Sequence, residues 1–309
     1  MGRSVLAISF LLSSFISKGQ QDNVYLFSYF KNNGKDGLHL AYSYDGFKWT
    51  ALNNDKSFLK PVLSKDSLMR DPCILRGADG KFHMVWTVSW NAKGIGYANS
   101  TDLINWSAQQ YIPVMESEDS ARNCWAPEIN YDPKAKQYVI YWATTIRGKF
   151  PAEDPTVENG YNHRMYYTTT KDFKNFTKTS VLYDKGFNVI DASIIKSGKE
   201  YVMFLKDETI KPQPQKNIRI ATSKKLTTGF SEPSAPITGK YWAEGPTAVK
   251  VGGEWLLYFD KYREHKYGAL SSTDLVKWTD VSDKISLPPG IRHGTIFTVT
   301  KEELAVLLR

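Results

Sequence analysis

The stretch NSTDLINW, residues 99–106, is one of five copies of a single pattern, and this repetition decides the fold. Each copy consists of a small polar strand end, a turn and an aromatic residue. The other four copies are YSYDGFKW (42–49), TTTKDFKNF (168–176), ATSKKLTTGF (221–230) and LSSTDLVKW (270–278). A turn that returns in this way indicates that the chain builds the same structural unit five times.

An apolar, aromatic-rich segment precedes each of these turns, as expected for a buried strand. The five segments are VYLFSYF (24–30), FHMVWT (82–87), YVIYWA (138–143), YVMFLK (201–206) and WLLYFD (255–260). Short strands separated by turns predict an all-β protein, and no stretch with helical periodicity competes. A unit of about fifty residues repeated five times predicts a five-bladed β-propeller with four strands in each blade.

A third repeated segment precedes four of the apolar strands and predicts the innermost strands, which surround the propeller axis. Its copies are RDPCIL (70–75), WAPEIN (125–130), IDASII (190–195), AEGPTAV (243–249) and RHGTIF (292–297). The fifth copy comes last in the chain, whereas its partner strands, residues 24–50, come first. We therefore expect the N-terminal strands and the C-terminal strand to close one blade together, which removes an exposed sheet edge.

The starts of the innermost strands converge on one face of a propeller, around its central depression. They bring together Asp71, Trp125, Asp191, Glu244, Arg292 and His293. Three carboxylates at one funnel suit hydrolysis of a glycosidic bond, because one must donate a proton to the leaving oxygen while another activates water. Each of these residues alone is also an ordinary turn residue. Their recurrence at similar places in different blades favours a catalytic site.

With these motifs in order, the chain resembles glycoside hydrolase family 43, the five-bladed propellers of the clan shared with family 62. The resemblance covers essentially the whole mature chain. It is carried by Arg-Asp-Pro (70–72), Trp-Ala-Pro (125–127), Ile-Asp-Ala-Ser (190–193), Glu-Gly-Pro (244–246) and Arg-His-Gly (292–294).

The resemblance implies an inverting mechanism with three assigned roles. Asp71 corresponds to the general base, Glu244 to the general acid, and Asp191 to the auxiliary aspartate that orients the acid and raises its pKa. Inversion leaves room for a water molecule, so base and acid are expected roughly 6.5–9.5 Å apart. The resemblance requires no cofactor, although a structural calcium or other cation on the axis near His293 is compatible with it.

Other residues are candidates for contact with sugar. Asp36, in NGKDGLHLAYS (33–43), is a turn residue, a sugar contact or a rival for the base. Trp90, Trp125 and Trp242 are candidate platforms for a sugar ring, with a structural role left open. Loops expected on the same face also carry Asp207-Glu208 and the segment 262–265.

The longest loop on that face, residues 146–162, is expected to wall off the funnel and to favour a pocket for one terminal sugar. His163 follows this loop, and a position in the pocket and a position on the surface both remain open. In contrast, the tryptophans of the repeated turns, Trp49, Trp106 and Trp278, are expected to be structural.

The sequence therefore favours an exo-acting inverting glycosidase that removes terminal sugars from polysaccharide or oligosaccharide side chains. α-L-Arabinofuranosidase is the leading hypothesis, followed by β-xylosidase and β-D-galactofuranosidase. Sucrose and fructan hydrolases share Arg-Asp-Pro, but they carry Glu-Cys where this chain has Glu244-Gly245. A non-catalytic carbohydrate-binding propeller remains the alternative from another class.

The bulk composition limits partners and location. The 309 residues carry a net charge of +8, but lysine and arginine are spread along the chain without a basic run, which does not favour binding of nucleic acid.

Residues 1–19 combine Arg3, an apolar run and a small-residue cleavage site, which is typical of a signal peptide. The apolar run is too short to span a bilayer, so no membrane insertion is expected. We expect a periplasmic or secreted protein in which residues 20–309 form one catalytic domain.

The chain has two cysteines, Cys73 and Cys124. Export permits one disulfide bond between them, but two buried free thiols are favoured.

Overall fold

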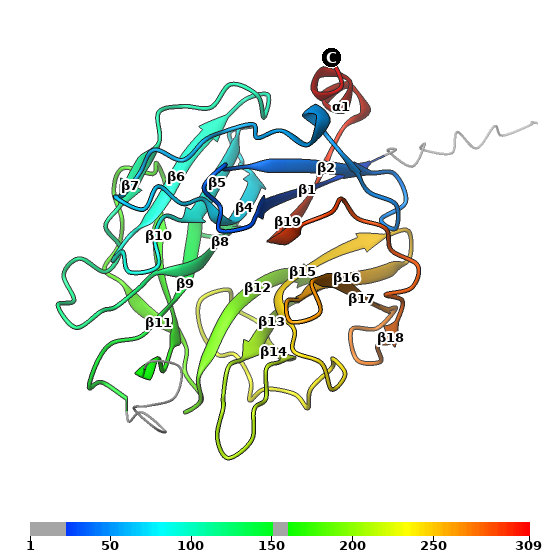
Figure 1. The fold of residues 1–309 in the computed structure, drawn as a ribbon. Coiled ribbons are helices and arrows are strands. Elements are labelled where there is room, and N and C mark those ends of the chain that lie inside the picture. Colours follow the sequence, from blue (N-terminus) through cyan, green and yellow to red (C-terminus); the bar gives the residue numbers. More distant parts are fainter. Residues whose placement is uncertain (1–22, 151–159) are drawn as a thin grey trace, which may run out of the picture.

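The computed structural model describes residues 23–150 and 160–309, so the expected signal peptide and the middle of the long loop lie outside the described residues. Five β-sheets are arranged around a central axis, as Figure 1 shows. The prediction of an all-β, five-bladed propeller is confirmed. Within the described ranges, no helix has the length and apolar character needed to cross a membrane.

Each sheet is an antiparallel meander whose innermost strand lies next to the axis. The first two complete blades contain β4 (Arg70–Arg76), β5 (Phe82–Thr87), β6 (Ile95–Ser100) and β7 (Gln110–Ile112), then β8 (Trp125–Asp132), β9 (Gln137–Thr144), β10 (Arg164–Thr170) and β11 (Ser180–Tyr183). The next two contain β12 (Val189–Ser197), β13 (Glu200–Asp207) and β14 (Asn217–Ser223), then β15 (Glu244–Val251), β16 (Glu254–Lys261), β17 (Lys266–Ser272) and β18 (Thr279–Asp280).

The fifth blade joins the two ends of the chain, as predicted. Its strand order is β19 (Ile291–Val299), β1 (Val24–Lys31), β2 (His39–Ser43) and β3 (Thr50–Ala51). The pairing begins at Val24 opposite Val299, and β1 is buried along nearly its whole length. In Figure 1 the blue β1 lies directly beside the red β19. The two termini therefore hold the ring closed by main-chain hydrogen bonds and apolar packing.

The third complete blade departs from the predicted four strands, because its sheet has only three. The segment SEPSAPIT (231–238) runs along β14 in place of a fourth strand. The hydroxyls of Ser231 and Ser234 accept hydrogen bonds from the backbone N–H groups of Thr222 and Ile220, at 3.1 and 3.0 Å. The backbone N–H groups of Ser231 and Ser234 still donate to the carbonyls of Thr222 and Ile220, whereas the serine hydroxyls replace the carbonyl acceptors of a regular ladder.

Among the described residues, one bounded 3₁₀ turn and one α-helix lie outside the blades. A 3₁₀ turn spans Asn53–Asp55, and α1 (Lys301–Leu307) follows β19. Thr300 and Glu303 form a capping box at the start of α1, and Leu304 and Leu307 bury its inner face. The sequence-based expectation of no helix missed α1, because seven residues are too few to display a clear helical period.

The repeated turns explain the aspartates and tryptophans of the sequence pattern. In NSTDLINW, Asp102 Oδ1 accepts hydrogen bonds from the backbone N–H groups of Ile104 and Asn105, at 2.9 and 2.7 Å. Trp106 Nε1 donates to the carbonyl of Leu103 at 3.1 Å and so closes the same turn. Asp45 and the other aspartates of the pattern accept equivalent bonds. The structural role predicted for the tryptophans is confirmed for Trp106, and the fifth copy lacks the aspartate because Lys225 takes its place.

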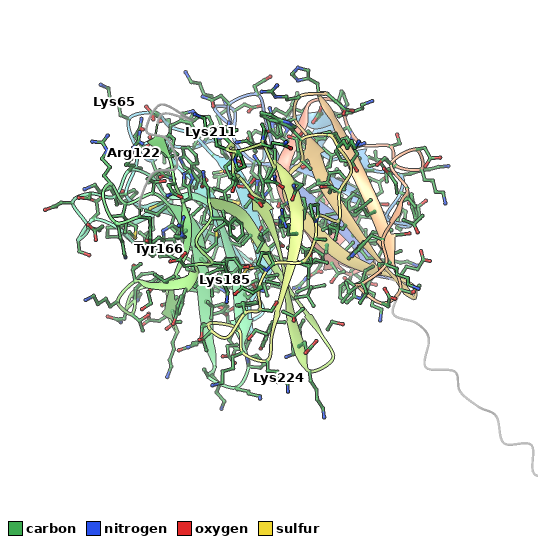
Figure 2. The ribbon with its side chains drawn as sticks, turned by 90° about the horizontal axis from the view of Figure 1, so that it is seen from below. Lys65, Arg122, Tyr166, Lys185, Lys211 and Lys224 are labelled. Carbon is green, nitrogen blue, oxygen red and sulfur yellow. The ribbon has the colours of Figure 1, made fainter. Side chains whose placement is uncertain are left out.

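The connections alternate between two faces of the ring. Figure 2 shows Arg122, which precedes β8, on the same edge as Lys211, which lies between β13 and β14. Lys224, just after β14, lies on the opposite edge. The starts of the innermost strands and the loops that follow the second strands therefore share one face.

Candidate active site

A β-bulge near the start of each innermost strand sets the direction of the site residues. The pairing register shifts at this point in all five blades. In the first four blades the bulge includes a residue with positive φ: Asp71 at 53°, Ala126 at 45°, Asp191 at 51° and Gly245 at 59°. This conformation is uncommon for residues other than glycine and is typical of functional sites. Glu244 lies one position before its bulge, so it is not strictly equivalent to Asp71 and Asp191.

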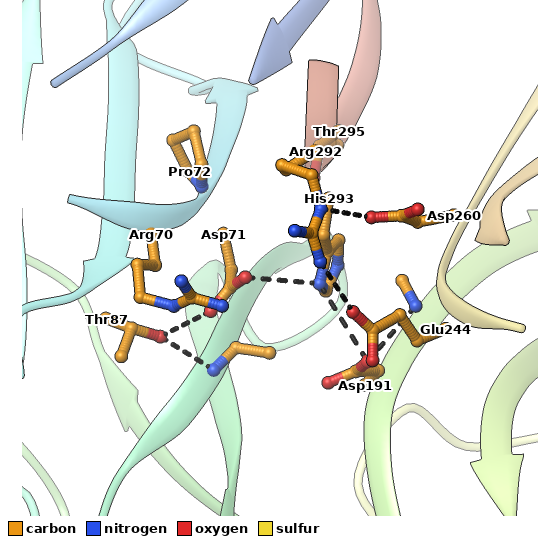
Figure 3. Close-up of polar contacts among 12 residues, drawn as sticks. Arg70, Asp71, Pro72, Thr87, Asp191, Glu244, Asp260, Arg292, His293 and Thr295 are labelled. Carbon is orange, nitrogen blue, oxygen red and sulfur yellow. Dashed lines mark hydrogen bonds and ion pairs between the residues drawn. The ribbon is translucent and has the colours of Figure 1, made fainter. Parts of the chain in front are cut away.

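The innermost strands and neighbouring loops enclose a cavity of about 430 Å³, a size suited to a small ligand. Eight residues predicted from the sequence line it: Asp71, Trp90, Trp125, Asp191, Trp242, Glu244, Arg292 and His293. Glu208, Tyr262 and Arg263 from the noted loops also line it, as do Arg70, Thr87, Ile190, Lys206 and Lys216, which sequence reasoning missed. Figure 3 shows Arg70 and Asp71 on one side of His293, and Asp191 and Glu244 on the other.

Asp71 is held by two polar partners. Thr87 Oγ1 donates to Asp71 Oδ2 at 2.8 Å, and it also accepts a hydrogen bond from the backbone N–H of Ala126 at 2.8 Å. His293 Nδ1 lies 3.4 Å from Asp71 Oδ1. Burial opposes ionisation of Asp71, but the hydrogen bond and positive charge of His293 outweigh it and hold the pKa below its ordinary value. The carboxyl is therefore ionised at neutral pH, as a base requires.

The pKa of Asp191 is shifted in the opposite direction to that of Asp71. Burial raises its pKa to about 6, and the negative charges of Glu244 and Asp71 add to this effect, while His293 and Lys206 oppose it. Its Oδ2 accepts a hydrogen bond from the backbone N–H of Gly245 at 3.1 Å. This bond links Asp191 to the strand that carries Glu244.

Glu244 is surrounded by cations. Lys206 Nζ lies 3.0 Å from its Oε2, and Arg292 Nη2 lies 3.3 Å from its Oε1. Arg292 Nε also donates to Asp260 Oδ2 at 2.5 Å. Burial opposes ionisation, but Lys206 and then Arg292 lower the pKa of Glu244. As the pH falls, Asp191 is therefore the member of the pair that takes up a proton first, and the assignment of Glu244 as the acid stays a prediction.

His293 lies against Gly245, and the two residues depend on each other. A Cβ at position 245 would lie 2.4 Å from His293 Cγ, so only glycine allows this approach. Asp71, Asp191 and the buried Glu128 outweigh burial and raise the pKa of His293 to about 9. The imidazole is therefore protonated at neutral pH and supplies positive charge on the axis.

Glu128 is a buried carboxyl that sequence reasoning missed, although it directly follows the Trp-Ala-Pro motif. Thr295 Oγ1 donates to its Oε1 at 2.9 Å, and Cys73 Sγ donates to its Oε2 at 3.4 Å. Burial raises its pKa to about 7. Cys73 and Cys124 are both buried free thiols, which confirms the favoured expectation.

The side chains around His293 provide no ready-made set of ligands for the axial cation that the resemblance leaves possible. The described part of the chain contains no group of three or more His, Cys, Asp or Glu residues arranged to hold a metal ion. His293 Nδ1 already faces Asp71 and, at 3.9 Å, Asp191. A cation on the axis therefore stays an untested expectation, and no step below depends on one.

Asp36 does not line the cavity. Its Oδ2 lies 2.8 Å from Nε2 of the buried His39, and its side chain is 47% exposed. This contact favours the turn interpretation over the role of base. A contact with a longer saccharide stays a prediction.

Trp90 and Trp125 form one wall of the cavity. Their rings meet edge to face at 5.6 Å, and Trp125 Nε1 donates to the carbonyl of Trp90 at 2.9 Å. His163 packs against the Trp125 ring at 4.9 Å, is buried, and has its pKa lowered to about 3 by burial. It therefore lies neither in the cavity nor on the surface, contrary to both expectations, and it supports the wall from behind.

Trp242 and Tyr262 form the opposite wall, with ring centroids 5.9 Å apart. Beside this wall, Glu208 pairs with both Lys206 and Lys216, and all three side chains line the cavity. Lys206 could have been suspected from the sequence, because it is the lysine that ends the apolar run YVMFLK (201–206). A charged residue at the end of a buried strand requires a partner.

Comparison with known proteins agrees with this geometry. The family model described as a probable glycosyl hydrolase domain, related to family 43, matches residues 21–305. An α-L-arabinofuranosidase of Bifidobacterium longum subsp. longum is 25% identical over 244 residues, which are 67% of this chain. The chain spans only 23% of the length of that relative.

Solved structures share the fold. An α-L-arabinofuranosidase from Lactobacillus brevis matches with a TM-score of 0.53 and 22% identity, over 69% of this chain and 72% of that one. A family 43 enzyme from Xanthomonas citri, solved with xylotriose, matches with a TM-score of 0.56 and 11% identity, over 72% and 75% of the two chains. The match to the family model covers nearly the whole chain, and the propeller brings Asp71, Asp191 and Glu244 into one cavity: the protein belongs to the family 43-related glycoside hydrolases.

Proposed function

We propose that the protein is an exo-acting, inverting α-L-arabinofuranosidase. The observation that carries the proposal is the contrast between two buried carboxyls in one cavity. The pKa of Asp71 is lowered, whereas that of Asp191 is raised to about 6. Groups with opposite shifts in one site can share the tasks of base and proton carrier. The sugar itself is supported by the name of the 25% identical relative.

Asp71 is the proposed base. Its carboxylate accepts from Thr87 and faces His293, so it is ionised before the reaction and can take a proton from the attacking water, which leaves the carboxyl neutral. Inversion places this water between Asp71 and the sugar.

Glu244 is the proposed acid, with Asp191 as the auxiliary aspartate that orients it and raises its pKa. The backbone N–H of Gly245 joins the two residues, and each carboxyl influences the pKa of the other. A bound sugar excludes water from the cavity and thereby favours the neutral form of a carboxyl. Glu244 then gains a proton and donates it to the leaving oxygen.

Residues 1–19 support a further part of the proposal, namely export of the protein to the periplasm or the medium. Expression of the full chain in a bacterial host and mass determination of the product test this point. A product that starts near residue 20 is expected, whereas a cell-internal product that retains residues 1–19 would contradict export.

The activity is tested with a panel of nitrophenyl furanosides and pyranosides, using the parent protein and Asp71→Asn. An aryl leaving group needs little help from an acid, so the panel isolates the base. We expect cleavage of the α-L-arabinofuranoside and a loss of about 10³-fold or more in kcat with Asp71→Asn, at the upper end of what general base catalysis provides. Cleavage of a xyloside or galactofuranoside instead would show that the proposed sugar is wrong but that the protein is a glycosidase.

Equal rates for parent and Asp71→Asn would show that Asp71 is not the base. No cleavage of any member of the panel, together with measurable binding of the same sugars, would favour a carbohydrate-binding propeller. Thr101→Ala, on an outer turn remote from the cavity, serves as the control and is expected to keep the parent rate.

A further inference from the structure

Two arginines lie on the faces of two tryptophans at the mouth of the cavity. Arg263 Cζ lies 3.5 Å from the centroid of the Trp242 ring, and Arg70 Cζ lies 4.2 Å from that of Trp90. A guanidinium at this distance covers one face of the indole ring and is fixed by it. Trp242 and Trp90 therefore each offer at most one face to a sugar, and each holds an arginine at the rim.

These two arginines differ from the other cations of the cavity in their partners. Lys206 and Lys216 pair with Glu208, and Arg292 pairs with Glu244 and Asp260. The polar partner of Arg70 is the amide oxygen of Asn33, at 3.1 Å. Within the described ranges, neither Arg70 nor Arg263 has a carboxylate within ion-pair distance.

The cavity consequently carries an excess of positive charge. Its lining includes five lysines and arginines and the protonated His293, against four carboxyls, of which Asp191 has its pKa raised to about 6. A concave surface with an excess of one sign concentrates ligands of the opposite sign. Charges that are buried in ion pairs contribute little to the electrostatic potential of the cavity. The positive potential therefore comes mainly from the two rim arginines, Arg70 and Arg263.

The position of Arg263 indicates which part of a substrate it meets. It lies in the turn between β16 and β17, where the backbone N–H of Glu264 bonds to the carbonyl of Lys261 at 2.8 Å. The side chain is exposed, whereas Asp71 and Asp191 lie deeper, next to the axis. A sugar cleaved at the axis leaves its neighbouring unit at the level of Arg263.

We propose that the saccharide recognised here is acidic, and that Arg263 selects it by binding the carboxylate of a uronic acid unit next to the cleaved sugar. The planar fork of a guanidinium matches the two oxygens of a carboxylate, and the Trp242 face orients this fork. This inference rests on the proposed hydrolase function, because it assigns the substrate class of the same site.

The test compares two matched oligosaccharides, one with the terminal arabinofuranosyl unit on a uronic acid and one in which that acid has been reduced to the neutral sugar. The parent protein is expected to show about ten- to hundredfold higher kcat/KM for the acidic member, since a hydrogen bond to a charged group contributes about 1.5–3 kcal/mol. Added salt is expected to reduce this preference, because it screens the rim charges.

Three variants assign the preference. Arg263→Gln is expected to bring the acidic-to-neutral ratio close to one, and Arg263→Lys, which keeps the charge but loses the fork, to give an intermediate ratio. Lys266→Gln removes an equal charge from the same hairpin at an exposed position outside the cavity, and is expected to leave the ratio unchanged. An equal loss of ratio in Lys266→Gln and Arg263→Gln would overturn the role of Arg263.

The nitrophenyl arabinofuranoside separates this inference from the proposed function. If the parent protein cleaves it but does not distinguish the two oligosaccharides, the inference is overturned and the function stands. If the protein cleaves nothing, calorimetric binding of the same pair decides, because preference for the acidic member supports the inference and equal or absent binding refutes it. An equal, Arg263-dependent preference for a sulfated analogue would overturn the assignment to a carboxylate.

Discussion

His293 Nδ1 lies 3.4 Å from Asp71 Oδ1, so the last innermost strand of the chain supplies the counter-charge of a carboxylate on the first complete blade. The same nitrogen lies 3.9 Å from Asp191 Oδ2. Burial alone would favour neutral carboxyls, and the imidazolium reverses this preference at Asp71 but not at Asp191. The two carboxyls that share this cation thus have pKa values shifted in opposite directions.

The charge on His293 predicts a pH dependence of stability. Its pKa is about 9 in the folded protein, above the ordinary value of 6.5, because Asp71, Asp191 and Glu128 face it. Its contribution to the free energy of unfolding is therefore fully present below pH 6.5 and is lost as the pH rises through about 9. Asp191 and Glu128 have pKa values raised to about 6 and 7. They also lower the free energy of unfolding as the pH rises through these values.

Denaturant unfolding of the parent and of His293→Asn between pH 6 and 10 measures this contribution. We expect His293→Asn to lower the free energy of unfolding by about 3 kcal/mol at pH 6, because it leaves buried carboxyls without their partner. The difference from the parent should shrink towards pH 10. A difference that is constant with pH would show that His293 is neutral in the fold.

Thr87 predicts a shift in the activity profile. Its hydroxyl donates to Asp71 and accepts from the backbone N–H of Ala126, so it joins two blades. Thr87→Val removes one stabilising bond from the Asp71 carboxylate, which raises its pKa and moves the acidic limb of kcat/KM to higher pH. It also leaves a buried N–H without a partner, at a cost of about 1–3 kcal/mol.

Thr87→Ser keeps the hydroxyl and is the matched control, with an acidic limb close to that of the parent. Thermal unfolding and the pH profile on an aryl arabinofuranoside provide the two measurements. Should Thr87→Val lose stability but keep the parent profile, Thr87 would be a structural link with no influence on the base.

Substrates whose leaving groups differ in their need for a proton can show which carboxyl is the general acid. Glu244→Gln is expected to slow cleavage of a natural oligosaccharide by about 10²–10⁴-fold, the range for general acid catalysis, but to slow cleavage of a dinitrophenyl glycoside far less. Asp191→Asn is expected to show the same dependence on the leaving group in a weaker form, because Asp191 acts through Glu244. If only Asp191→Asn showed the dependence on leaving group, Asp191 would be the acid and Glu244 its partner.

Removal of the aspartate from a repeated turn is expected to lower the stability of the protein without lowering its activity. Asp102 Oδ1 accepts two backbone N–H groups, and these bonds outweigh burial and lower the pKa of Asp102 to about 2. Asp102→Ala is expected to reduce the free energy of unfolding by about 1 kcal/mol near pH 7, as for comparable caps. The contribution of a lowered carboxyl pKa is present above pH 4 and disappears as the pH falls through about 2. An unchanged melting temperature near pH 7 would show that the turn does not depend on this carboxylate.

The repeated segments made the fold and three carboxyls predictable. Asp71, Asp191 and Glu244 stand near the starts of segments whose apolar pattern marks innermost strands, so topology alone brings them together. Lys206 and Thr87 escaped prediction because they end second strands, and only the antiparallel register places such residues beside Ile190 and Arg70. Asp36 lies in a loop that does not reach the cavity and contacts His39, in line with the turn interpretation, while a contact with a longer saccharide stays a prediction.

The third complete blade and α1 are two further features that the sequence pattern did not predict. A fourth strand was expected after the turn at 221–230, but in SEPSAPIT serine hydroxyls replace the carbonyl acceptors of the ladder. α1 depends on a capping box and two buried leucines, which are too few residues for a periodic pattern.

The pairing of β1 with β19 has a consequence for biosynthesis. Arg292 and His293 enter the cavity on β19, the last strand in chain order, whereas Asp71 lies on the first complete blade. A nascent chain can therefore complete four blades and still lack both the cations that balance the carboxyls and the strand that closes the ring. The charged lining of the cavity is therefore complete only when β19 has paired with β1.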